Sequence, residues 1–203
     1  MKNIILDRIP QKSIRAFIQA QLKNNVSSIS DLKSTYTKGD DLSKFLMHQE
    51  DYKVPHSLEI VWKHYITANP SEVWNGNMLS FGLMVSKNDG EIMYVDEEYS
   101  AAKVGQVFYI NLNILGGIIK LPVAHEIIAI EPLESYFELS YIEGRKNIGM
   151  QRIAFSESND GNTEIVHTTY YKSDSNFRDR YIYPFFHAKA IGEWHQNMAD
   201  SIV

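Results

Sequence analysis

The chain has 203 residues, of which 44% are hydrophobic and 22% are charged, so it is long enough to bury a sizeable core as one domain or one domain with an extension. The formal net charge is −5 and no cluster of Lys and Arg stands out, which argues against nucleic acid and anionic membranes as partners. The absence of cysteine excludes disulfides, thiolate metal sites and a cysteine nucleophile.

The N-terminal part of the chain, residues 1–55, has the spacing of amphipathic helices. Its start, MKNIILDRIPQKSIRAF, does not have the pattern of a signal peptide, and no apolar run is long enough for a membrane span, so we expect a cytoplasmic protein. One predicted helix has Ile14, Phe17 and Ile18 on one face, and another begins after Asp40 with Leu42 and Phe45 on one face. We expect these helices to pack on the main domain as an extension. The alternative is a dimerisation arm that forms a homodimer.

A change of period marks the start of the main domain, which we place at residues 56–203. In SLEIVWKHYI the residues Leu58, Ile60, Trp62, His64 and Ile66 alternate with others, which predicts a strand with one buried face. The following Asn69 and Pro70 suit the cap and the first turn of a short helix. We expect that helix to close one end of a curved sheet with Val73 and Trp74.

Seven more strand-like runs follow, at residues 79–86, 91–95, 105–115, 118–131, 136–143, 149–158 and 163–172. Turn residues such as Lys87-Asn88-Asp89-Gly90 separate several of them, which favours an antiparallel meander. Pro122 lies inside one run and should occupy an edge position or a bulge, because proline has no N–H to donate to the ladder.

The last segment predicts a long amphipathic helix. Apolar residues recur every three or four positions from Phe177 to Ile202, and Pro184 should kink or split the helix. The order of elements predicts an α+β architecture, in which a curved antiparallel sheet of about seven strands wraps around the C-terminal helix. A strongly curved sheet and a straight helix do not fill space together, so we expect a cavity between them.

Two segments carry a resemblance to a known superfamily. The stretch ITANPSEVW and the last helix, SNFRDRYIYPFFHAKAIGEWHQNM, resemble the START-like (SRPBCC) superfamily, which has the helix-grip fold of the birch-pollen allergen. Gly105-Gln106-Val107 and the run from Phe137 to Tyr141 with Gly144 are similar to a bacterial subfamily of unknown function. The resemblance covers about residues 57–200. One departure is Ile142-Glu143, where that subfamily tends to have Gly-Thr.

The resemblance implies a cavity that binds a hydrophobic or amphipathic small molecule, such as a lipid, a polyketide or an aromatic metabolite. Strand tyrosines and a tryptophan would make such a cavity apolar with a few hydroxyl donors. The residues that we predict to line it are Trp62, His64, Tyr109, Tyr141, His167, Phe177, Tyr181 and Phe185. We predict no cofactor and no metal, since His187 and His195 are eight residues apart on one helix, or about 12 Å along its axis.

Two other functions stay open at this point, because members of the superfamily also include enzymes and co-chaperones and a fold does not fix a function. The first is a protein-interaction domain whose cavity is filled by its own side chains. The second is an enzyme of the cyclase or hydratase type, with His64 or His167 as the general base and a tyrosine hydroxyl that polarises a carbonyl. We rank ligand binding first and catalysis last, because no pair of polar residues with catalytic spacing is recognisable.

Overall fold

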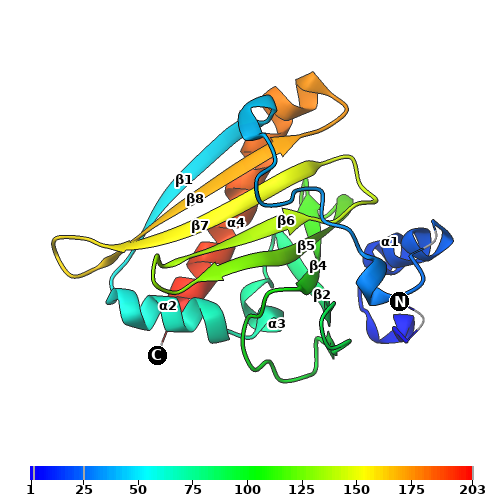
Figure 1. Ribbon diagram of the computed structural model, residues 1–203, viewed down its shortest axis with the longest axis horizontal. Helices are drawn as coiled ribbons and strands as arrows, with labels where there is room; N and C mark the ends of the chain where they lie inside the picture. The colour runs from blue at the N-terminus through cyan, green and yellow to red at the C-terminus, as the bar shows by residue number, and fades with distance from the viewer. Residues whose placement is uncertain (2, 25, 203) are drawn as a thin grey trace.

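The computed structural model describes residues 1, 3–24 and 26–202, and its centre is an antiparallel sheet of eight strands that curves around the C-terminal helix (Figure 1). The strand order is β1-β8-β7-β6-β5-β4-β2-β3. The strands are β1 (Leu46–Val54), β2 (Leu79–Ser86), β3 (Ile92–Tyr94), β4 (Gln106–Ile114), β5 (Ile119–Glu131), β6 (Tyr136–Tyr141), β7 (Ile148–Glu157) and β8 (Thr163–Lys172).

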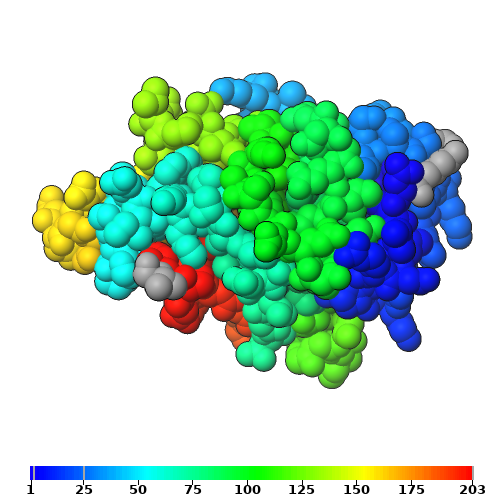
Figure 2. Space-filling view, turned by 90° about the horizontal axis from the view of Figure 1, so that it is seen from below, coloured from blue at the N-terminus to red at the C-terminus, as the bar shows by residue number. Residues whose placement is uncertain are grey.

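Four α-helices accompany the sheet. They are α1 (Lys12–Lys23), α2 (Leu58–Thr67), α3 (Pro70–Val73) and α4 (Tyr183–Asp200), and a π-helical turn, Arg178–Ile182, leads directly into α4. Short 3-10 turns lie at Leu6–Arg8, Ile29–Asp31 and Leu42–Lys44. Seen from below, α2 and the C-terminal end of α4 meet on one side of the molecule, and the N-terminal segment lies at the other end (Figure 2).

The two faces of the sheet are covered by different helices. α4 lies in the concave face, where its buried Trp194 and Met198 join strand residues such as Phe108 and Ile153 in one hydrophobic cluster. α1 covers part of the other face, where Phe17 contacts Tyr109 in an edge-on arrangement. Because consecutive strand residues point to opposite faces, β4 contributes Phe108 and Ile110 to one cluster and Val107 and Tyr109 to the other.

The α1 face of the sheet depends on one glycine. Gly82 lies at a register shift between Phe81 and Leu83 in the β2–β4 ladder. A Cβ atom at Gly82 would lie 2.4 Å from Cδ1 of Ile14. The glycine therefore lets α1 approach the sheet, and the apolar face that we predicted for α1 is buried within the same chain. The predicted homodimer through this segment stays a prediction.

The strand predicted at residues 58–66 is wrong, because this segment is the helix α2. Val61 and Tyr65, one helical turn apart, are its buried residues, while Ile60 is exposed. The segment satisfies both periods, since Leu58, Val61, Trp62 and Tyr65 also form a helical stripe. Alternation over so few residues could not decide between the two structures.

The helix predicted after Asp40 is also wrong beyond its first turn. Only Leu42–Lys44 is helical, and β1 begins at Leu46 and pairs along its length with β8. β1 is an edge strand whose only buried residue is Val54, so its pattern lacks the buried face by which strands are recognised. This strand lies before residue 56, where we expected the main domain to begin, and the predicted domain division stays a prediction.

Several other predictions are confirmed. The strands after residue 78 are β2 to β8, and the helix-grip architecture holds with eight strands instead of about seven. Asn69 caps α3 by accepting a hydrogen bond from the Ser71 N–H (3.0 Å), and Pro184 lies in the first turn of α4, directly after the π-helical turn. Pro122 lies in a part of β5 that pairs with β4, and the β5–β6 ladder begins only at His125.

Candidate ligand cavity

The space between α4 and the sheet contains an outer chamber of about 470 Å³ near the start of α4. Its walls come from β4, β5, β6 and β7 on one side and from the π-helical turn and α4 on the other. Most lining side chains are apolar, for example Leu121, Val123, Phe186, Ala190 and Ile191. The buried polar lining residues are His125, Tyr141 and Gln151.

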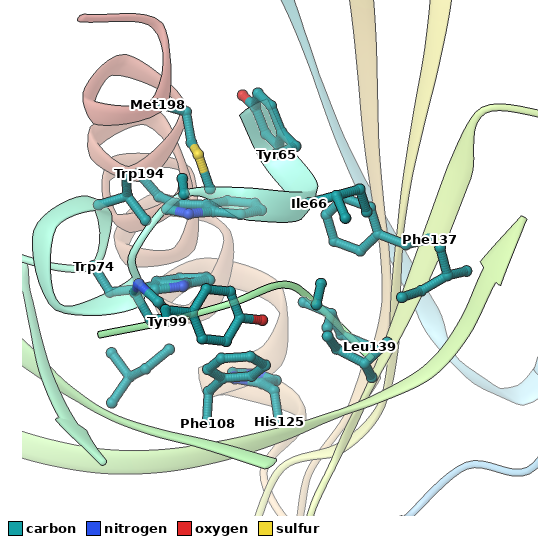
Figure 3. A pocket seen from close by; sticks show the side chains of 17 residues that line it. Tyr65, Ile66, Trp74, Tyr99, Phe108, His125, Phe137, Leu139, Trp194 and Met198 are labelled. Carbon is teal, nitrogen blue, oxygen red and sulfur yellow. The ribbon is translucent and has the colours of Figure 1, made fainter. Parts of the chain in front are cut away.

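Toward the end of α4 the same space is filled by aromatic rings. Trp74, at the end of α3, stacks on Trp194 with ring centroids 4.4 Å apart, and Tyr65 contacts Trp194 and Phe155 edge-on. The predicted role of Trp74 as a closure of the sheet is in line with this packing. Only an inner chamber of about 40 Å³ remains, about the space of one water molecule. Figure 3 shows Trp194 and Met198 from α4 above Tyr99, Phe108 and His125.

Polar contacts hold α4 to this filled end. The Glu193 carboxylate accepts hydrogen bonds from the backbone N–H groups of Asn77, Met78 and Leu79, at 2.8–3.1 Å. The Asn197 side chain donates to the backbone carbonyl of Val73 (3.0 Å). Hydrogen bonds to a charged acceptor are stronger than neutral ones, so these contacts fix the second half of α4 against the turn that follows α3.

A hydrogen-bonded chain of side chains runs behind the chamber wall, and Gln151 is at its centre. The amide nitrogen of Gln151 lies 3.1 Å from His125 Nε2 and 3.2 Å from the Tyr141 hydroxyl. Its amide oxygen lies 2.8 Å from His167 Nε2. The Tyr141 hydroxyl in turn forms a short hydrogen bond with the Tyr183 hydroxyl. The chain therefore joins four strands, β5, β6, β7 and β8, to the start of α4.

The same chain continues from His167 into the filled end. His167 Nδ1 lies 2.9 Å from His195 Nε2, and His195 Nδ1 lies 2.7 Å from the Tyr65 hydroxyl. Tyr52 stacks on the His195 ring, with centroids 4.1 Å apart. Both ring nitrogens of His167 and of His195 are therefore engaged.

The buried histidines are neutral. Burial lowers the pKa of His125 to about 4 and that of His195 to about 3, because the charged imidazolium loses its hydration. Burial also lowers the pKa values of His167 and His187, and a neighbouring histidine adds to the effect in each case: His195 for His167 and His167 for His187. In the described residues no group of three or more His, Cys, Asp or Glu side chains is arranged to hold a metal ion.

The outer rim of the chamber is basic. Arg145 and Lys146 are exposed, and Arg178 lies on the π-helical turn. Asp174 pairs with Lys146 (2.7 Å) and with Arg178 (2.9 Å), which follows it by four residues. Burial and charge therefore differ along the chamber: neutral polar groups lie inside and cations lie at the rim.

Of the eight residues predicted to line the cavity, Tyr141 lines the outer chamber. Tyr109 lies on the opposite face of the sheet and donates its hydroxyl hydrogen to the amide oxygen of Gln21 (2.9 Å). The prediction for Tyr109 was wrong because both faces of β4 are buried. Alternation then shows that neighbouring residues face opposite ways, but not which face carries α4.

The predicted α2 residues and His167 lie close to the cavity without lining either chamber. Trp62 packs edge-on against Phe155, with ring centroids 5.5 Å apart. His64 Nε2 lies 2.9 Å from the Ser201 hydroxyl, near the C-terminal end of α4. Both were placed by the wrong strand prediction for residues 58–66. His167 faces α4 as expected, but it serves as an interior link of the hydrogen-bonded chain.

The predicted inner face of the last helix was also wrong. Phe177, Tyr181 and Phe185 are 66%, 63% and 54% exposed, so these side chains point away from the sheet. The sequence around these three residues is rich in aromatic side chains, so the aromatic pattern did not identify the inner face. In addition, the π-helical turn rotates the residues before Tyr183 relative to those of α4. The side chains that do face the sheet are Tyr183, His187, Ala190, Ile191, Trp194, His195 and Met198.

Sequence reasoning missed four polar residues of the chamber: His125, Gln151, Tyr183 and His187. A signal existed for His125, because its neighbour Glu126 is charged and suits an outward position, and alternation along the strand then places His125 on the inner face. Glu126 does lie on the other face, where it accepts a hydrogen bond from Ser34 and pairs with Lys87 (2.9 Å). The positions of Gln151 and Tyr183 depend on strand pairing and on the helix rotation.

Comparison with known proteins supports the fold and leaves the activity open. No protein-family model matches the sequence, and no curated protein is detectably similar to it. Among solved structures, major latex-like protein 151 of Panax ginseng is similar, with a TM-score of 0.57 and 12% identity over 78% of this chain and 97% of that one. A truncated norcoclaurine synthase of Thalictrum flavum has a TM-score of 0.57 and 11% identity over 78% and 93%. A protein of Chromobacterium violaceum has a TM-score of 0.51 and 9% identity over 77% and 96%.

These similarities confirm that the chain has the helix-grip fold that its sequence resembles. Identities this low show the fold alone. The bacterial subfamily and the cytoplasmic location stay predictions. No helix in the described part of the chain has both the length and the apolar character that a membrane crossing requires.

Proposed function

We propose that this protein binds one hydrophobic or amphipathic small molecule in the outer chamber between α4 and the sheet. The observation that carries the proposal is the chamber itself, about 470 Å³ with mainly apolar walls and a few inward polar groups. Small-molecule sites have volumes of roughly 300–1,000 Å³ and this type of lining. Burial of apolar ligand surface would supply most of the affinity, at about 25 cal/mol per Å².

The basic rim favours an amphipathic ligand within this class. An apolar body would occupy the chamber near Ile191 and Leu121, and a polar or anionic end would lie near Arg145 and Arg178. A self-filled cavity describes the inner end, where aromatic rings leave about 40 Å³, but not the outer chamber. The two similar plant proteins are a major latex-like protein and a norcoclaurine synthase, so the fold accommodates proteins of different function.

Filling the chamber tests the proposal. The side chain of Ala190 is buried and lines the chamber, so Ala190→Phe places a ring where the ligand body would lie. The probe is 1-aminoanthracene, an uncharged dye that fluoresces in apolar surroundings. The matched control is Ala20→Phe on α1, because Ala20 is exposed and does not line the chamber.

We expect the unmodified protein and Ala20→Phe to bind one dye molecule each with the same affinity, and Ala190→Phe to lose at least tenfold in affinity. Circular dichroism and thermal melting confirm that the variants fold, and Ile191→Phe serves as a second blocking variant on the same wall. Equal dye binding by all variants, or no dye binding by the unmodified protein, would contradict the proposal.

A further inference from the structure

The hydrogen-bonded chain behind the chamber has a direction, which Gln151 sets. Its amide group has two N–H donors, and these point at His125 Nε2 and at the Tyr141 hydroxyl oxygen. Its carbonyl oxygen accepts from His167 Nε2, so the proton of the neutral His167 ring is on Nε2. A neutral imidazole has only one N–H, so His167 Nδ1 is an acceptor.

The remaining links follow from this start. His167 Nδ1 accepts a hydrogen bond from His195 Nε2, which leaves His195 Nδ1 as an acceptor for the Tyr65 hydroxyl hydrogen. In this arrangement both N–H groups of Gln151, the N–H groups of His167 and His195, and the O–H of Tyr65 each have an acceptor.

The opposite amide orientation is less favourable. With its amide turned around, Gln151 would donate one N–H to His167 and leave its second N–H without an acceptor. The ring protons of His167 and His195 would move to their other nitrogens, and the Tyr65 hydroxyl would become an acceptor whose own hydrogen lacks its partner His195. A buried donor without an acceptor is costly. The turned amide leaves two such donors, whereas the orientation in the structure leaves one, on His125.

This direction makes His125 a donor toward the ligand space. Because His125 Nε2 accepts from Gln151, the ring proton is on Nδ1, and Nδ1 is buried without a hydrogen-bond partner. The side chain is 7% exposed and lines both the outer and the inner chamber. The N–H that this hydrogen-bonded chain leaves without an acceptor therefore lies at the junction of the two chambers.

A second donor lies beside it. The Tyr141 ring is 4.5 Å from the His125 ring, measured between centroids. The hydrogen bond between the Tyr141 and Tyr183 hydroxyls uses the hydrogen of one of them. The hydrogen of the other hydroxyl is not part of that bond. Tyr141 and Tyr183 both line the outer chamber, so this hydrogen is available to a bound molecule. Two donors on one wall suit an oxygen with two lone pairs.

We propose that the ligand is an apolar molecule with an uncharged carbonyl group, whose oxygen accepts hydrogen bonds from His125 Nδ1–H and from the Tyr141–Tyr183 pair. This inference rests on the proposed function of the cavity and names the chemical group that the site selects. A carboxylate does not fit the same place, because the histidines there are neutral and the cations Arg145 and Lys146 are exposed at the rim. Burying an unpaired charge costs far more than burying a carbonyl that is hydrogen-bonded.

Two compounds of the same shape test the proposal. In 2-acetylnaphthalene a carbonyl oxygen stands where 2-isopropenylnaphthalene has a CH₂ group. We expect the protein to bind the ketone about tenfold more tightly by competition with 1-aminoanthracene, since one or two additional hydrogen bonds stabilise its complex. His125→Phe should lose most of this preference, because only the hydrogen bond from the Tyr141–Tyr183 pair is left. His125→Asn, whose side-chain N–H takes the place of Nδ1–H, should keep most of the preference.

Infrared spectroscopy gives a readout that needs no variant. The carbonyl stretch of bound 2-acetylnaphthalene should lie at lower wavenumber than in hexane, because a hydrogen bond weakens the C=O bond.

Equal affinity for the two compounds, or an unshifted stretch, would overturn the inference and leave the proposed cavity intact if Ala190→Phe still blocks binding. If His125→Phe and His125→Asn both lose the preference for the ketone, the preference depends on the shape of the imidazole ring. That result would overturn the role of His125 Nδ1–H as a donor. If neither compound displaces the dye, the inference fails, while dye binding that Ala190→Phe blocks still supports the cavity. If the dye does not bind either, the proposed function fails too.

Discussion

The two ends of the space between α4 and the sheet differ in what fills them. At the end near the C-terminus of α4, rings from α2, from the end of α3 and from β6 pack around Trp194 and leave about 40 Å³. At the other end α4 presents smaller side chains such as Ala190 and Ile191, and about 470 Å³ remain. The same helix and the same sheet thus form a core at one end and a cavity at the other.

The difference shows that side-chain volume from the helices before β2 decides where the cavity lies. Trp74 and Tyr65 pack against Trp194, in the second half of α4. Glu193 and Asn197 hold that half in place by hydrogen bonds to backbone groups. The stability of the protein should therefore depend on the filled end, and ligand binding should depend on the open end.

The largest expected effect is a difference between two Phe→Ala variants. Phe155→Ala removes a buried ring that contacts Tyr65, Trp62 and Phe137, and it should lower the free energy of unfolding by about 3–5 kcal/mol. Phe186→Ala removes a half-buried ring from the wall of the open chamber and should cost about 1 kcal/mol. Urea unfolding followed by circular dichroism measures both. Similar losses would contradict the distinction between the two ends.

The dependence of stability on pH sharpens the comparison. The ordinary pKa of His125 is 6.5 and burial lowers it to about 4 in the folded protein. Between these values the unfolded chain binds a proton that the folded chain does not bind, so stability falls as the pH is lowered from about 6.5 to about 4. Each such histidine contributes up to about 1.4 kcal/mol per pH unit.

Urea unfolding at pH values from 7.5 to 5 tests this expectation. In His125→Phe the free energy of unfolding should depend less steeply on pH, by the equivalent of up to one proton. The reason is that the group that gains a proton on unfolding is gone. Loss of the same slope in His56→Phe, at a half-buried histidine that lines neither chamber, would not fit the account.

The anchoring of α4 to the filled end gives the next effect in size. Glu193→Gln removes the charge that accepts hydrogen bonds from three backbone N–H groups and should cost about 2 kcal/mol. Glu157→Gln at the exposed end of β7 is the control and should be neutral within about 0.5 kcal/mol. Hydrogen exchange at residues 77–79 should become faster in Glu193→Gln alone. Unchanged exchange there would mean that the carboxylate does not hold the turn.

The smallest effect concerns the two faces of the sheet. Tyr109→Phe loses the hydrogen bond to Gln21 and should cost about 1 kcal/mol, with no change in the affinity for 1-aminoanthracene or 2-acetylnaphthalene. Tyr141→Phe, on the α4 face, should weaken binding of the ketone by a few-fold. Titration of both variants with both probes decides the point. A change of probe affinity in Tyr109→Phe would contradict its placement on the α1 face.

The sequence was sufficient for most of the fold because its strands are separated by clear turn residues and its last helix follows a Pro-containing start. It was not sufficient at residues 46–66, where the edge strand β1 buries little and α2 satisfies two periods at once. The candidate site was harder to predict. Tyr141 was found, but Tyr109 faces the other helix, and Phe177, Tyr181 and Phe185 are exposed.

The missing information is relative orientation. Alternation within a strand separates its two faces, but both faces of β4 are apolar because α1 covers one and α4 the other. The side of a helix that faces the sheet depends on its rotation, which the π-helical turn before Tyr183 changes. His125 and Gln151 come together only through the pairing of β5, β6 and β7.

Native mass spectrometry of the freshly purified protein tests the central claim most directly. We expect a fraction of the protein to carry one small apolar molecule that is released on denaturation, and we expect Ala190→Phe prepared in the same way to carry none. An added equivalent of 2-acetylnaphthalene should restore a single adduct in the unmodified protein after its molecule has been removed. A protein that shows no adduct in either case would contradict the claim that the open end of this fold is a binding site.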